Sequence, residues 1–328
     1  MAGQQIGQAN ISHQGLHASI LTIGASLCDL TVDMPAGRRR VILRHASPQS
    51  YLGNPHYLGS IAGRCANRIR DGHCIIEDRA FQLDRNENGI THLHGGRLGF
   101  SRRSWLIASH SDHAVELTLH SEDGDQGYPG NAVVSCTYEI LPGARLRLVL
   151  RATCDAATLM NLAGHAYFNL EPGTSILDHS LQIDAGHYTP VDQALVPNGR
   201  IVPVDGTSFD FLKSRRIGER RAQSPLGFDH NFVLAAAPRA EPQRAATLVS
   251  PGRDLSMNIL TTEPGLQFYD GQKLSPDADE PESGHLPFAA CCLEPQRHPD
   301  AVHHPNFVQA LLKANQEYLQ ITEYHFEF

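Results

Sequence analysis

The chain lacks several features that define whole classes of protein. It has no dense cluster of lysine and arginine, and a formal net charge of −8 at pH 7 argues against nucleic acid as a partner. No segment approaches the roughly 18 apolar residues of a membrane span, so we expect no contact with a membrane. The polar residues 1–10 lack the apolar core of a signal peptide, which favours a cytoplasmic location.

Paired cysteines are missing as well. The seven cysteines form an odd set without a C-x-x-C pair, and adjacent cysteines such as Cys291 and Cys292 rarely form a relaxed disulfide. We therefore expect reduced, buried thiols, as in a cytosolic protein.

Long amphipathic helices are also scarce. Only residues 307–318 and 215–222 suggest helices, and both segments are short. The dominant pattern is instead an alternation of apolar and polar residues, which is typical of a strand with one buried face. Strands are predicted at residues 17–32, 115–120, 133–141, 145–153, 180–185, 255–261, 266–269 and 318–328.

Turn pairs such as Asp71-Gly72 and Pro264-Gly265 separate these strands. Many short strands with regular turns predict an all-β protein, a large antiparallel β-sandwich. No repeat or interdomain linker stands out, so we expect a single domain over residues 1–328.

Two histidines, His92 and His94, stand two residues apart before a pair of glycines. On a strand they would point to the same face, and the glycines would let the backbone approach a ligand closely. The pattern fits a metal pair in a cupin-like enzyme, completed by Glu294 or a later histidine. It also fits one histidine facing a sugar, or two surface histidines at the end of a strand.

Other candidates for chemistry stand inside strand-like segments. Burial would lower the pKa of His165, which lies in an apolar, aromatic run, and would raise the pKa of Glu294, which follows a small apolar run. Groups with such pKa values can exchange protons near neutral pH. Taken singly, each also fits a structural role. Four further polar residues could bind hydroxyl groups of a ligand: Asn67, Arg68, Asp229 and Gln267.

In this order along the chain, these segments resemble the aldose 1-epimerases, also called galactose mutarotases. The resemblance covers roughly residues 59–307. It rests on eight motifs: Gly63-Arg64-Cys65-Ala66-Asn67-Arg68-Ile69, Leu93-His94-Gly95-Gly96, Gly127-Tyr128-Pro129-Gly130, His165-Ala166-Tyr167-Phe168-Asn169-Leu170, Asp229-His230-Asn231-Phe232, Pro264-Gly265-Leu266-Gln267-Phe268-Tyr269, Leu293-Glu294 and Pro299-Asp300-Ala301-Val302.

The resemblance implies a β-sandwich of the galactose mutarotase type with a sugar-binding cleft. By position, Glu294 corresponds to the general base of the family, His165 to its general acid and His94 to a second active-site histidine. Residues that hold sugar hydroxyls in the family correspond to Asn67, Arg68, Asp229 and Gln267. The implied reaction interconverts the α and β anomers of a free aldohexose or aldopentose, with neither cofactor nor metal ion.

Three departures from the family pattern lie close to these residues. Gly164 stands where the family usually has Asn, Asp270-Gly271-Gln272 where it often has Thr-Gly-Asn, and Pro295 where it commonly has Thr. None removes a proton-transfer group, so we expect them, together with the loop at 275–285, to affect the preferred sugar and not the reaction.

Other hypotheses stay open at this point. A sugar-binding module of the same fold could have lost turnover. A phosphosugar epimerase would need several basic groups around the phosphate, for which Arg68 and Arg97 are available. The expected assembly is a monomer or a homodimer.

Overall fold

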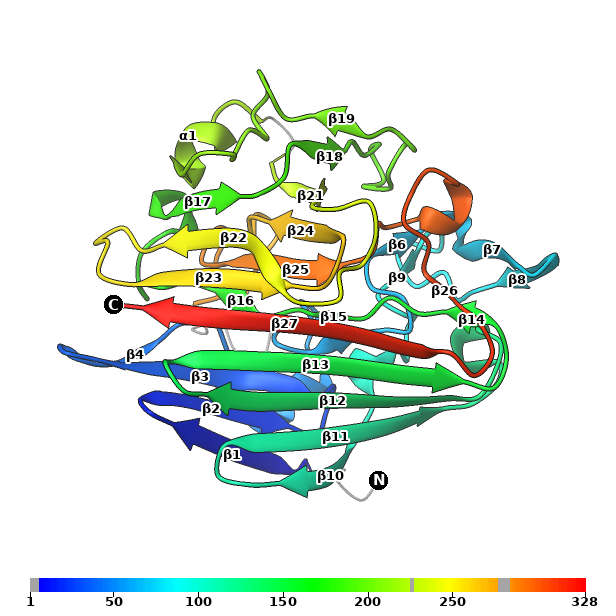
Figure 1. The fold of residues 1–328 in the computed structure, drawn as a ribbon, viewed down its shortest axis with the longest axis horizontal. Helices are drawn as coiled ribbons and strands as arrows, with labels where there is room; N and C mark the ends of the chain where they lie inside the picture. Colours follow the sequence, from blue (N-terminus) through cyan, green and yellow to red (C-terminus); the bar gives the residue numbers. More distant parts are fainter. Residues whose placement is uncertain (1–5, 225–226, 277–283) are drawn as a thin grey trace.

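The computed structural model describes residues 6–224, 227–276 and 284–328. Its largest sheet has nine strands, and every neighbouring pair is antiparallel (Figure 1). In spatial order they are β10 (Leu106–His110), β11 (Ala114–Ser121), β12 (Ala132–Leu141), β13 (Arg145–Cys154), β27 (Glu317–Glu327), β23 (Ser256–Thr261), β22 (Gln243–Val249), β17 (Ser180–Ile183) and β20 (Arg215–Arg216).

Two further sheets pack against this one. The six-stranded sheet consists, in spatial order, of β16 (Tyr167–Phe168), β25 (Cys291–Gln296), β24 (Gly265–Tyr269), β21 (Asp229–Val233), β18 (His187–Thr189) and β19 (Val202–Pro203). The four-stranded sheet consists of β1 (Gln8–His13), β2 (Leu16–Leu21), β3 (Ser26–Met34) and β4 (Gly37–Arg40).

Two-stranded sheets and short helical turns complete the described fold. The two-stranded pairs are β5 (Ile61–Ala62) with β15 (Ala163–Gly164), β6 (Arg68–Ile69) with β9 (His92–Leu93), β7 (His73–Ile76) with β8 (Arg79–Gln82), and β14 (Thr158–Leu159) with β26 (Leu311–Leu312). The helical elements are α1 (Ile217–Arg221) and 3-10 turns at Pro48–Leu52, Arg70–Gly72, Phe100–Arg102, Asp125–Gly127, Ile176–Asp178 and Ala301–His303.

The main core lies between the nine-stranded sheet and the other two. In β13 the even-numbered residues Leu146, Leu148 and Leu150 are buried while their neighbours are not, as the sequence alternation predicted. Phe168 of β16 packs across the layers on Tyr324 of β27, with ring centroids 5.2 Å apart. Each such buried side chain stabilises the fold by about 1.5–3 kcal/mol, so the alternation fixes which face of each strand points inward.

The prediction of a large antiparallel β-sandwich is confirmed. The short helix expected at 215–222 is α1, and the seven cysteines are free and buried, as predicted. No helix in the described ranges is long and apolar enough to cross a membrane.

Two predictions about elements were wrong. The single strand expected at 17–32 is two strands, β2 and β3, because the chain turns at Gly24 and Ala25, which both have positive φ. The helix considered at 307–318 does not form: Leu311 and Leu312 pair with β14, and Asn315 turns the chain into β27. Of the loop at 275–285, residues 277–283 lie outside the described residues.

Candidate active site

A cavity of about 160 Å³ lies against the face of the six-stranded sheet that points away from the main core. Drug-sized ligands occupy pockets of about 300–1,000 Å³, so this cavity suits a smaller ligand. Six of the seven predicted site residues line it; Gln267 does not. The described lining is Pro55, His56, Tyr57, Asn67, Arg68, Glu87, His94, His165, Tyr167, Asp229, Tyr269, Lys273 and Glu294.

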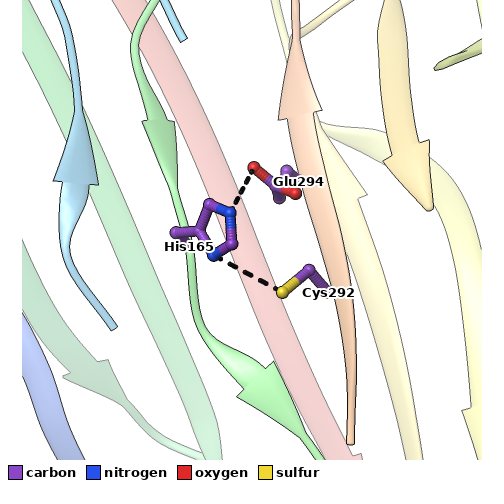
Figure 2. A group of neighbouring side chains, drawn as sticks. All are labelled: His165, Cys292 and Glu294. Atoms are coloured by element: carbon purple, nitrogen blue, oxygen red, sulfur yellow. Dashed lines mark hydrogen bonds and ion pairs between the residues drawn. The ribbon is translucent and has the colours of Figure 1, made fainter. Parts of the chain in front are cut away.

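Glu294 and His165 face each other inside this cavity (Figure 2). Oε2 of Glu294, on β25, lies 3.7 Å from Nε2 of His165. Both side chains are buried, and Oε2 has no hydrogen-bond partner within the described ranges. His165 lies between β15 and β16, where its backbone N–H donates to Ser60 and its carbonyl accepts from Gly59. Strand β25 therefore fixes Glu294, and the backbone of Gly59 and Ser60 fixes His165.

Burial moves the pKa values of this pair in opposite directions. It raises the pKa of Glu294 well above its usual range, and Asp229 adds to the rise while Arg68 opposes it. It lowers the pKa of His165 to about 4. Burial penalises the charged form of each group, and thus favours a protonated carboxyl beside a neutral imidazole. A carboxylate beside an imidazolium holds the same number of protons, so one proton moving from Oε2 to Nε2 interconverts the two forms.

Hydrogen bonding fixes the tautomer of His94. The backbone N–H of Asn67 donates to Nδ1 of His94 over 3.2 Å, and the backbone N–H of His94 donates to the Asn67 carbonyl over 3.0 Å. Burial lowers the pKa of His94 well below its usual value, and the charges of His165 and Arg68 lower it further. The ring is therefore neutral, with its proton on Nε2, and it can donate a hydrogen bond beside His165, whose ring centroid is 5.1 Å away.

Arg68 is held in place by two carboxylates. Its Nε and Nη2 each donate to one oxygen of Glu87 over 2.8 Å, and its Nη1 lies 3.6 Å from Oδ2 of Asp229. Burial disfavours the charge of Arg68, but Asp229 and Glu87 more than offset this, so its pKa is raised. Gln267 supports Asp229 by donating from Nε2 to Oδ1 over 2.7 Å. Arg68 and Asp229 thus have fixed orientations from which they can bind hydroxyl groups.

A third buried residue, Cys292, completes the group in Figure 2. Its Sγ lies 3.5 Å from Nδ1 of His165. Ligand atoms of Cys292, His165 and Glu294 lie within 4.8 Å of one another, a composition that could hold a metal ion. The thiol and the carboxylate, however, approach opposite nitrogens of the imidazole. A tetrahedral site takes one nitrogen from each histidine, so this arrangement does not fit a metal ion.

The prediction that His92 and His94 lie on one face of a strand was wrong. Strand β9 ends before His94, which has a φ of 49°, and the chain turns away there. Nδ1 of His92 lies 2.6 Å from the Asp84 carbonyl oxygen, and Nε2 lies 2.6 Å from the Tyr128 hydroxyl. Because both ring nitrogens are engaged, His92 is not available as the metal ligand that the cupin-like hypothesis requires.

Two of the sequence motifs support the site from outside the cavity. Arg64 is buried and donates to the carbonyl of Pro129 over 2.8 Å. Asp300 accepts from the backbone N–H of Arg70 over 2.9 Å and donates its own backbone N–H to the Arg68 carbonyl over 3.1 Å. Asp300 therefore positions the strand that carries Arg68.

A larger cavity, of about 660 Å³, lies on a different part of the molecule. Arg40, Arg44, His45 and Asn169 are among its lining residues, and its described lining contains no carboxylate. It therefore lacks a pair of groups that could exchange protons with a ligand, whereas the smaller cavity has one.

Several residues of the smaller cavity were not singled out from the sequence, among them Tyr57, Glu87 and Lys273. Glu87 stands in a segment rich in Asn and Gly, which by itself indicates a surface turn. Its role depends on the contact with Arg68, nineteen residues earlier, and only the fold reveals that contact.

Comparisons with known proteins agree with this description. The family model for aldose 1-epimerase matches residues 8–325. The chain is 34% identical to an aldose 1-epimerase of Escherichia coli (96% of this chain and 93% of the relative) and 36% identical to a galactose mutarotase of Sus scrofa (95% and 91%).

Solved structures show the same similarity. An aldose epimerase homologue from C. elegans superposes with a TM-score of 0.90 at 25% identity, covering 98% of this chain and 99% of that one. A galactose 1-epimerase from Lactobacillus acidophilus superposes with a TM-score of 0.83 at 27% identity, covering 99% of each chain. This chain therefore belongs to the aldose 1-epimerase family of isomerases.

Proposed function

We propose that this protein interconverts the α and β anomers of a free monosaccharide. The observation that carries the proposal is the buried pair in the small cavity: an unpaired carboxyl oxygen of Glu294 lies 3.7 Å from Nε2 of His165. Anomer exchange requires one group that takes a proton and one that gives a proton at neighbouring oxygens of the same sugar, and this pair meets that requirement.

The reaction begins with ring opening. The Glu294 carboxylate takes the proton of the C1 hydroxyl, a C1=O bond forms, the bond from C1 to the ring oxygen breaks, and Nε2 of His165 delivers its proton to that oxygen. Rotation about the C1–C2 bond presents the other face of the carbonyl. Closure reverses both proton transfers, so neither residue is consumed. General acid and base groups each contribute typically about 10²–10⁴-fold.

The two proton transfers leave a neutral carboxyl and a neutral imidazole, the form that burial favours. Forming the charged pair before the reaction takes a proton from Glu294 to His165 and none from solvent. Burial makes this charged pair costly to form, and the two proton transfers of ring opening return the site to the neutral form that burial favours.

The remaining side chains hold the sugar while C1 turns. In this proposal Nε2–H of neutral His94 donates to the sugar beside His165, and Arg68 and Asp229 bind hydroxyls of the ring. Asn67 anchors His94 through its backbone, and Gln267 acts through Asp229. An open chain that stays bound by these contacts can reclose before it escapes.

Anomer exchange observed by NMR or polarimetry tests the proposal. We expect the protein to accelerate exchange for at least one of galactose, glucose, xylose, arabinose and fucose, and the Glu294→Gln variant to lose most of that acceleration. A protein that binds one of these sugars without accelerating exchange would be a sugar-binding module instead, and the proposed reaction would be wrong.

A further inference from the structure

The thiol of Cys292 lies next to the proton-transfer pair, yet neither the sequence motifs nor the proposed reaction uses it. Cys292 and Glu294 are two residues apart on β25, so both side chains point to the same face of the strand and reach His165 (Figure 2). Glu294 approaches Nε2 of the ring and Cys292 approaches Nδ1. The imidazole is thus held between two side chains of a single strand.

The chemistry of the acid step decides where the hydrogen between Cys292 and His165 lies. His165 must give up a proton from Nε2 and remain a neutral imidazole, because losing both ring protons would leave an unstable anion. Its second proton must therefore be on Nδ1. The atom that can accept a hydrogen bond there is Sγ of Cys292, 3.5 Å away.

We propose that Cys292 is a positioning residue: its sulfur accepts the Nδ1–H of His165 and so determines that Nε2 is the nitrogen that exchanges protons with the sugar. This inference rests on the proposed function, because it explains how His165 is prepared for that reaction. Cys292 itself does not line the described part of the cavity, so it acts through His165.

The chemical nature of the group that accepts from Nδ1 affects how readily His165 gives up its Nε2 proton. Burial raises the pKa of the Cys292 thiol well above its usual value, so the sulfur is neutral and accepts only weakly. A carboxylate at this position would stabilise an imidazolium, as in serine protease triads, and would make the ring a weaker acid. A thiol holds the ring and leaves the Nε2 proton easy to transfer.

Other groups around the ring do not provide the same contact. Glu294 faces the opposite nitrogen, and the rings of Tyr57, Tyr167 and His94 lie with centroids 5.8, 5.2 and 5.1 Å from that of His165. The charges of Asp229 and His56 reach the imidazole only at long range. Within the described ranges, Cys292 is the side chain in hydrogen-bond contact with Nδ1.

The neighbouring residue offers a matched control. Cys291 is equally buried and stands on the same strand, but it points into the main core and not toward His165. Cys291→Ala therefore removes a buried thiol from β25 without touching the acid. If the loss of any buried thiol from β25 lowered kcat, both Cys291→Ala and Cys292→Ala would show the decrease.

Kinetics of Cys292→Ala, Cys292→Ser and Cys291→Ala test the inference. Removing the acceptor leaves a buried N–H of His165 unpaired, which disfavours the Nδ1–H tautomer by about tenfold. We expect Cys292→Ala to lower kcat by about this factor with little change in KM. Cys292→Ser, which restores an acceptor, should recover most of the loss, and Cys291→Ala should keep the wild-type kcat. Equal rates for Cys292→Ala and Cys291→Ala, or a Ser variant as slow as the Ala variant, would overturn the inference.

A second measurement keeps this inference separate from the proposed reaction. ¹⁵N NMR of the wild-type protein, labelled at histidine, reports which nitrogen of neutral His165 carries the proton, whether or not the protein turns over sugar. We expect Nδ1–H in the wild type and a shift toward Nε2–H in Cys292→Ala. A wild-type ring protonated mainly at Nε2 overturns the role of Cys292 even if anomer exchange is fast. An inactive protein with Nδ1–H overturns the proposed function and keeps the hydrogen bond.

Discussion

Replacing Glu294 by Gln separates the catalytic role of this residue from its cost to stability. The change keeps the shape of the side chain and removes its ability to take a proton, so anomer exchange should fall by about 10²–10⁴-fold. It also removes a buried carboxyl whose pKa lies well above its usual range. Such a group holds its proton more tightly in the folded state, so stability falls as pH rises from about 4.5 through the folded-state pKa.

Glu263 provides a quantitative control for this stability effect. It is fully buried outside the cavity, its two carboxyl oxygens have no hydrogen-bond partner in the described part of the chain, and burial raises its pKa from 4.5 to about 7. Each unit of pKa is worth about 1.4 kcal/mol. The advantage of Glu263→Gln over the wild type in free energy of unfolding should therefore grow by about 3 kcal/mol between pH 4.5 and pH 8.

Urea unfolding at several pH values, together with NMR anomer exchange, checks both variants. We expect both to gain stability relative to the wild type as pH rises, and only Glu294→Gln to lose activity. A Glu294→Gln variant within tenfold of the wild-type rate would refute its role as the base. Differences in unfolding free energy that do not change with pH would refute the argument that these carboxyls are destabilised by burial.

Three further predictions concern the surroundings of the pair. Because one group acts as a base and the other as an acid, kcat/KM should follow a bell-shaped pH profile. Asp229→Asn removes a charge that raises the pKa of both groups, so both limbs of this profile should move to lower pH; limbs that stay in place would contradict this coupling. Glu87→Gln removes the bidentate partner that holds buried Arg68, so KM for the sugar, measured by steady-state kinetics, should rise by about tenfold or more. An unchanged KM would show that Arg68 does not need this partner. His92→Phe breaks the hydrogen bonds to Tyr128 and Asp84 and should lower the free energy of unfolding by about 1–3 kcal/mol. The folded variant should keep a rate of anomer exchange within a few-fold of the wild type; a stable variant with lost activity would instead place His92 in the reaction.

Much of the fold could be predicted from the sequence because burial alternates along its strands. Residues 145–153 show the period of two that places Leu146, Leu148 and Leu150 in the core. The pattern failed where a tight turn interrupted an apolar run, as at Gly24, or where pairing with a distant strand overrode a helix-like pattern, as at Leu311 and Leu312. The extent of a single domain over residues 1–328 stays a prediction.

The site was partly visible in the sequence for a related reason. His165 and Glu294 are polar residues in apolar segments, and the cost of burying them indicated a role before their contact was known. Cys292 gave no such signal, because a buried cysteine is an ordinary core residue. Its contact with His165 joins residues 127 positions apart, and only the pairing of β16 with β25 brings them together.

The position of β27 has a consequence for folding during translation. This strand lies in the middle of the nine-stranded sheet, between β13 and β23 (Figure 1), yet it is translated after all the strands around it. Until residues 317–327 leave the ribosome, β13 and β23 each expose an unpaired edge, and open edges invite association with other chains. Nascent chains should therefore need protection by chaperones until β27 has been synthesised, and chains truncated before this strand should aggregate.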